Sequence, residues 1–134
     1  MRIVLLVAAF SCAGCATTTG LPARDRRPVE RDVEGYAIAS CLASQAEPYL
    51  RDQGDAWAAV IVQRMKGDLD SFVAVGEQVK RELSAGHMAI IRDESVGNGD
   101  KVLPVLYCSE IIDQPAVRRT ISQSIVALQS AYEE

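Results

Sequence analysis

The sequence predicts an all-α fold, a compact bundle of about five helices stapled by one disulfide. Apolar residues recur at steps of three and four over most of residues 31–134, which is the spacing of one face of a helix. No segment alternates apolar and polar residues over five or more positions, as a half-buried strand does. The chain has 134 residues, enough for one helical domain after a short leader.

Residues 1–14 have the pattern of a secretory signal of the lipoprotein type. Arg2 supplies a positive charge, the apolar run 3–10 follows, and small residues lead to Cys15. The apolar run is far shorter than the roughly 18 residues that cross a bilayer. The Ala-Gly-Cys that ends at Cys15 resembles a bacterial lipobox, although Cys12 stands where leucine is usual. We expect lipid on Cys15, with simple cleavage as the alternative, and a periplasmic location, anchored to the outer membrane if the lipid is present.

Residues 15–30 predict a flexible tether. They contain threonines, a glycine, two prolines and a charge cluster, with no apolar period. The three arginines between positions 24 and 27 could contact anionic lipid headgroups, but Asp25 and Glu30 dilute their charge. A solvated linker is the preferred interpretation.

The first two helices are predicted on either side of Pro48, which is expected to stop or kink the first. The apolar stripe of the first helix, from Arg31 onward, is Val33, Ala37, Ile38, Cys41 and Leu42. The second helix is expected to start after Gly54, with Asp55 as its N-cap, and to end at Gly67. Its apolar face is expected to consist of Trp57, Ala58, Ile61, Val62 and Met65.

Three further helices complete the predicted bundle. The third begins near Asp70, and its stripe is Phe72, Val75, Val79 and Leu83. A short fourth helix is expected within residues 102–112, around Leu103, Leu106, Cys108 and Ile111. The fifth begins at Pro115, which suits a first helical turn, and its stripe is Val117, Ile121, Ile125 and Leu128.

Residues 92–101 predict the one long loop of the domain. The segment has two glycines, five charged residues and no apolar periodicity. Exposed loops on a rigid scaffold often carry recognition residues, and Gly97 and Gly99 permit a tight tip. The alternative is a plain connection between helices. The candidate binding residues are Arg92, Asp93, Glu94, Ser95, Val96, Gly97, Asn98, Gly99, Asp100 and Lys101.

Cys41 and Cys108 each lie on an apolar stripe of a predicted helix. Because the leader predicts an oxidising compartment, this even pair is expected to form a disulfide. Closing a loop of roughly 67 residues is worth about 4 kcal/mol on the chain-entropy model. The alternative is two buried free thiols.

Composition and spacing exclude several classes of function. A formal net charge of −4 argues against a nucleic-acid binder, which needs a dense basic face. His87 is the only histidine, so the common zinc sites are not expected, and a thiol nucleophile would need His87 beside a reduced cysteine. The acidic residues of the loop lack the alternating order of a calcium site. We expect a binding module rather than an enzyme, with no metal and no cofactor.

Two stretches around the cysteines resemble a known family. They are YAIASCL at residues 36–42 and LPVLYCSEII at residues 103–112. They are similar to the two cysteine signatures of the type VI secretion amidase immunity proteins, the subgroup that neutralises papain-fold cell-wall amidases. The resemblance extends from about Gly35 to Leu128.

The resemblance implies a small helical periplasmic protein, usually a homodimer, with a disulfide between the signature cysteines. Such a protein binds its cognate amidase effector and plugs the catalytic cleft with a protruding loop, here residues 92–101. The effector cuts the γ-D-glutamyl–diaminopimelate bond of peptidoglycan, and acidic loop residues could meet basic groups beside its Cys–His pair. The lipobox departs from the family, in which a free periplasmic form is commoner. Two other interpretations remain, an inhibitor of a different lytic enzyme and a structural envelope lipoprotein.

Overall fold

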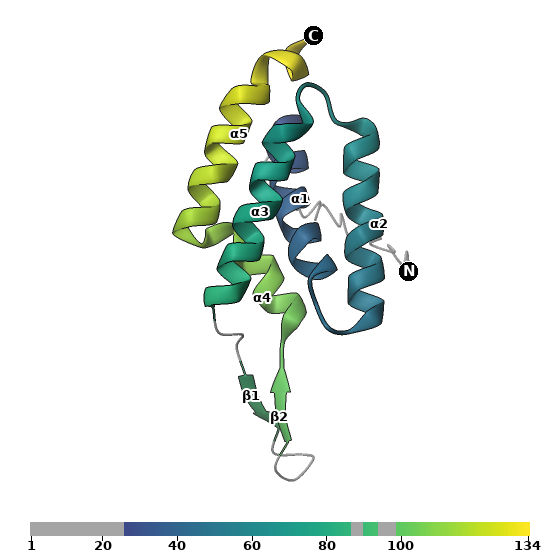
Figure 1. Ribbon diagram of the computed structural model, residues 1–134, viewed down its shortest axis with the longest axis vertical. Helices are drawn as coiled ribbons and strands as arrows, with labels where there is room; N and C mark the ends of the chain where they lie inside the picture. The colour runs from purple at the N-terminus through teal and green to yellow at the C-terminus, as the bar shows by residue number, and fades with distance from the viewer. Residues whose placement is uncertain (1–25, 87–89, 94–98) are drawn as a thin grey trace, which may run out of the picture.

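The computed structural model describes residues 26–86, 90–93 and 99–134 (Figure 1). The elements are α1 (Pro28–Ala43), α2 (Pro48–Arg64), α3 (Leu69–Ala85), β1 (Ile90–Asp93), β2 (Gly99–Val102), α4 (Pro104–Glu110), the 3-10 turn η2 (Ile111–Asp113) and α5 (Pro115–Glu133). The expected all-α bundle, with five α-helices in this part of the chain, is therefore confirmed. The expected signal segment and Cys15 lie outside the described residues.

α1 is the central helix, and α2, α3, α4 and α5 all pack on it (Figure 1). It begins at Pro28, so residues 28–30, expected to belong to the tether, are helical. Proline suits the first turn of a helix, and the Glu30 carboxylate accepts a hydrogen bond from the backbone N–H of Arg27. The predicted stripe is confirmed, because Val33, Ala37 and Cys41 are fully buried. No helix in the described ranges is long and apolar enough to cross a bilayer.

The predicted start of the second helix is wrong. α2 begins at Pro48, which opens this helix instead of kinking the previous one, and Gly54 lies inside it against the backbone of α1. The predicted face is also too wide, since Trp57 and Val62 are 39% and 38% exposed and Ile61 alone is fully buried. The reason is that α2 lies at the edge of the bundle and packs mainly on α1, so only a narrow strip of its side chains is buried. Gly67 follows the helix with φ +85°, which confirms it as the boundary.

The third and fifth helices match their predicted stripes. Phe72, Val75 and Val79 of α3 are fully buried, and the Asp68 carboxylate caps the helix by accepting from the N–H of Asp70 at 3.0 Å. The buried residues of α5 include Val117, Ile121 and Leu128. Edge-to-face packing of Tyr36 on Phe72, with ring centroids 5.4 Å apart, joins α1 to α3 in the same core.

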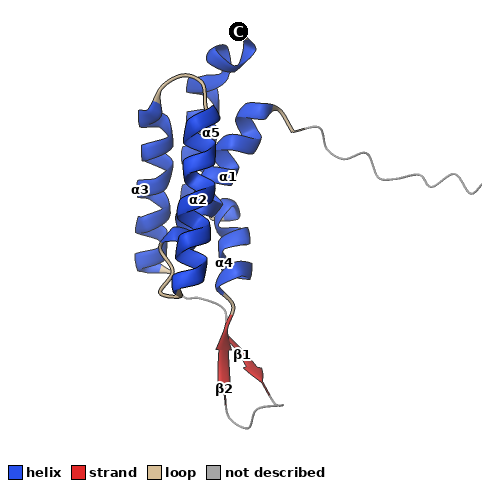
Figure 2. Ribbon diagram, turned by 90° about the vertical axis from the view of Figure 1, so that its right-hand side faces the viewer, coloured by secondary structure: helices blue, strands red, loops and turns tan. Residues whose placement is uncertain are grey.

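Residues 92–101 are not simply a loop. β1 and β2 form an antiparallel hairpin with Ile90 opposite Val102 and Asp93 opposite Gly99, and residues 94–98 lie outside the described residues. The hairpin projects from the end of the bundle where α3 finishes and α4 begins (Figures 1 and 2). Each strand has only four residues, too few for the period-two pattern that predicts a strand.

Candidate functional site

The hairpin carries the candidate binding residues that the structure describes. Arg92 and Asp93 lie in β1, while Gly99, Asp100 and Lys101 lie in β2, and the register places Arg92 opposite Asp100. The Lys101 side chain is exposed. The remaining candidates lie outside the described residues. The structure therefore brings the two ends of the predicted segment side by side, away from the helices (Figure 2).

The root of the hairpin has exposed apolar side chains that sequence reasoning did not select. Ile90 and Val102 are direct cross-strand partners, so both side chains point to one face of the ribbon. Ile90 is 60% exposed and Val102 49%. Val105 and Leu106, on the first turn of α4, are also exposed. A periodicity search could not find this surface, because it detects apolar residues that face a core.

The predicted disulfide is confirmed. Cys41 of α1 and Cys108 of α4 are bonded, with an S–S distance of 2.11 Å and a Cα–Cα distance of 5.4 Å, and both are fully buried. The bridge therefore links α4, the helix that follows β2, to the central helix α1. Because both described cysteines are bonded, neither offers a thiolate nucleophile.

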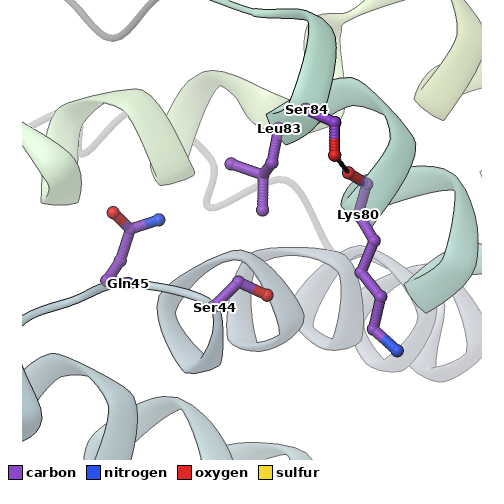
Figure 3. Close-up of a pocket in the computed structure, with 5 residues that line it drawn as sticks. All are labelled: Ser44, Gln45, Lys80, Leu83 and Ser84. Atoms are coloured by element: carbon purple, nitrogen blue, oxygen red, sulfur yellow. Dashed lines mark hydrogen bonds between the residues drawn. The ribbon is translucent and has the colours of Figure 1, made fainter.

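Gln45 covers this disulfide and lines a hollow beside it. Its Nε2 donates to the Cys41 carbonyl at 2.9 Å and lies 3.4 Å from Cys108 Sγ and 3.8 Å from Cys41 Sγ. Figure 3 shows Gln45 and Ser44 beyond the end of α1, facing Lys80, Leu83 and Ser84 of α3 across an open hollow of about 380 Å³. The hollow lies between helices and not on the hairpin.

Two charged clusters bind the helices to one another. The buried Asp32 accepts from Arg64 Nη2 at 2.7 Å and from the Tyr132 hydroxyl at 3.1 Å, joining α1, α2 and α5. Burial, followed by the hydrogen bond to Asp32, raises the pKa of Tyr132 above its ordinary value. Glu34 accepts from Arg118 Nη1 at 2.6 Å and from Arg26 at 3.1 Å. Since the members of each cluster bond mainly to one another, we interpret both as structural.

Neither a metal site nor a catalytic constellation emerges from the described residues. Across them, no three histidine, cysteine, aspartate or glutamate side chains are grouped to hold a metal ion. His87, the one imidazole considered for catalysis, lies outside the described residues. The described chain thus defines a disulfide-linked helical protein with a projecting β-hairpin. No protein-family model, no curated protein and no solved structure matches it.

Proposed function

We propose that the protein is a periplasmic immunity protein that binds and blocks a peptidoglycan amidase effector of type VI secretion. The proposal starts from the resemblance of the two cysteine motifs. The observation that carries it is the hairpin, which holds Arg92, Asp93, Gly99, Asp100 and Lys101 on two strands outside the bundle. A narrow projection on a covalently braced scaffold is the shape that a plug for an enzyme cleft requires.

The proposed inhibition is steric, and the hairpin contributes two parts to it. The segment between the strands enters the cleft of the amidase and occupies the place of the peptide substrate, with Asp93 and Asp100 close to basic groups of the enzyme. The exposed Ile90, Val102 and Val105 at the root then lie against the rim of the cleft. Burying apolar side chains there supplies affinity, while the charges supply orientation and speed of association.

The proposed location is the periplasm, where the amidase would meet its substrate. The Cys41–Cys108 bridge supports it, because disulfides persist in oxidising compartments. Anchoring through lipid on Cys15 and assembly as a homodimer belong to the same proposal. Changing Cys15→Ser should move the protein from the membrane fraction to the soluble periplasmic extract. An unaltered protein that is already soluble would contradict the anchor.

The deciding experiment is calorimetric titration of the purified mature protein with its proposed target, a papain-fold cell-wall amidase. We expect one binding event, together with loss of amidase activity on peptidoglycan fragments. An amidase whose active-site cysteine carries a bulky maleimide is the matched control, since a filled cleft should not accept the hairpin. Equal binding to the blocked enzyme would contradict the plug.

Two outcomes would favour the other interpretations. Binding to a muramidase or another lytic enzyme, with none to the amidase, indicates an inhibitor of a different target. Recovery with envelope components and with no lytic enzyme indicates a structural lipoprotein.

A further inference from the structure

We propose that the Cys41–Cys108 disulfide and Tyr107 position the hairpin on the bundle, so that reducing the bridge frees the hairpin while α1, α3 and α5 stay folded. The effect on inhibition rests on the proposed function, but the positioning itself does not. The bridge and Tyr107 act through the hairpin and have no direct part in binding.

The first argument is how little besides the disulfide holds α4. Only Leu103 separates the end of β2 from Pro104, so the direction of β2 follows that of α4. α4 has seven residues, of which Cys108 alone is fully buried, and its main packing partner outside the following turn is α1. An isolated helix of this length is not stable in water. The bond from Cys108 to Cys41 is therefore its covalent attachment to the central helix, beside the packing of Tyr107 and of the buried Ile111 that follows the helix.

The second argument is that Tyr107, in the helix after β2, contacts the backbone at the end of α3, where the chain leaves toward β1. Gly86 directly follows α3, and its N–H donates to the Glu82 carbonyl at 2.7 Å. A Cβ on Gly86 would collide with the Tyr107 hydroxyl, so the tyrosine from α4 lies directly against the backbone where the chain leaves α3. The exit toward β1 and the helix after β2 thus meet at one side chain.

The third argument concerns access to the bridge. Both sulfurs are buried, but Gln45 contacts them and also lines the hollow of Figure 3. Gln45 therefore contacts both the hollow and Cys108 Sγ, and we infer that a reductant reaches the bridge beside this side chain. A dithiol reductant then delivers two electrons and two protons, leaving two cysteine thiols and the cyclic disulfide of the reductant.

The test compares backbone order in the oxidised protein and in the Cys41→Ala/Cys108→Ala variant by ¹⁵N relaxation. We expect order parameters for Ile90, Lys101 and Val102 to fall from about 0.85 to below about 0.6 in the variant. Those of α1, α3 and α5 should hardly change. A hairpin that keeps its order without the bridge would overturn the proposal, and so would equal loosening of every element.

A matched control and a second variant make the test decisive. Leu128→Ala removes a core side chain near Gly67, at the other end of the bundle, with the bridge intact, so hairpin order should be unchanged. If the double variant does not fold, Tyr107→Ala decides, because it keeps the bridge and removes the contact with Gly86. A fall in the order of Ile90 and Val102 supports positioning, and no fall overturns it.

A binding measurement distinguishes failure of this inference from failure of the proposed function. The double variant should bind the amidase at least about tenfold more weakly than the oxidised protein, whereas Leu128→Ala should bind equally well. If the oxidised protein itself does not bind the amidase, the proposed function fails, while the relaxation data still decide the role of the bridge. Full affinity in a double variant with a disordered hairpin would overturn the link between position and inhibition.

Discussion

Asp32 is a buried carboxylate that joins three helices, and it is only 2% exposed. One of its oxygens accepts from Arg64 at 3.0 Å and 2.7 Å, and the other accepts from Tyr132 at 3.1 Å. A charge taken out of water is tolerated only when its hydrogen bonds are replaced, so each partner of Asp32 matters more than a pair on the surface.

Removing the guanidinium should therefore lower stability. Arg64→Ala leaves the Asp32 carboxylate with Tyr132 and the longer contact to Arg31, and we expect a loss of about 2 kcal/mol. Urea unfolding should show a lower midpoint with an unchanged slope. Lys80→Ala is the control, because the exposed Lys80–Glu77 pair at 2.9 Å should contribute little. Equal effects of the two changes would show that burial of Asp32 is not what matters.

Tyr132 should make the fold sensitive to alkali. Burial and the bond to Asp32 raise the pKa of its hydroxyl in the folded state above the ordinary value of 10.0. A group with a raised folded pKa contributes stability that is fully present below its unfolded pKa and is lost as the pH rises through the folded value. From about pH 10 upward the native protein should thus lose more stability than Tyr132→Phe, as urea titrations at several pH values will show. Parallel losses would contradict this assignment.

At the scale of elements, Gly54 sets the distance between α1 and α2. A Cβ at this position would lie 2.7 Å from the Ala39 carbonyl oxygen and 2.8 Å from Ala43 Cα, and these backbone atoms cannot move aside. Gly54→Ala should cost about 3 kcal/mol in thermal unfolding, although alanine is the better helix former. Gly76→Ala is the matched change, because its nearest neighbour is Tyr36 Cε1 at 3.5 Å, an ordinary contact. It should stabilise by about 0.5–1 kcal/mol, and the same sign for both changes would refute the argument.

The elements that could be predicted are those with a broad buried face. α3 and α5 pack on α1 and on each other, so Phe72, Val79 and Ile121 recur at helical spacing along them. α2 was misplaced because its buried strip is narrow and the residue that fixes its packing, Gly54, has no side chain to reveal it. Pro48 was ambiguous for a physical reason, since proline both stops one helix and starts the next.

The candidate site was predicted only in part. Charges and glycines located the projecting segment 92–101, since such residues rarely belong to a buried core. The strands within it were missed because each has only four residues, too few to show a period of two in the sequence. The roles of Gln45 and Tyr107 depend on residues distant in the sequence, so no local pattern predicts them.

At the scale of the whole molecule, the described contacts that stabilise the fold lie in the helices, and the proposed binding segment lies in the hairpin. The core residues, the Cys41–Cys108 bridge and the Asp32 cluster all lie within the bundle. The hairpin residues whose burial is described, Ile90, Lys101 and Val102, are exposed and lie outside this core, so we expect the fold to tolerate changes in them. This division favours a protein whose scaffold stays constant while its projecting segment matches one partner.

Shortening the hairpin should consequently abolish inhibition and spare the fold. Replacing residues 92–101 by a Gly-Ser link joins Ile91 to Val102, which lie close together on neighbouring strands because Val102 is opposite Ile90, the residue before Ile91. The helical circular dichroism and the urea midpoint should stay close to those of the native protein, since surface connections tolerate changes in length. Calorimetry against the amidase should detect no binding.

Charge reversal within the same segment tests how it binds. Changing Asp93→Lys and Glu94→Lys together should weaken binding by about 2 kcal/mol, on the order of thirtyfold, if these carboxylates lie at the centre of the interface. Glu133→Lys with Glu134→Lys is the matched control, because it makes the same change of charge at the end of the molecule opposite the hairpin (Figure 1). A slower association with similar affinity would place Asp93 and Glu94 at the rim. Unchanged affinity in the shortened protein, with a normal helical spectrum, would instead move the inhibitory surface onto the helices.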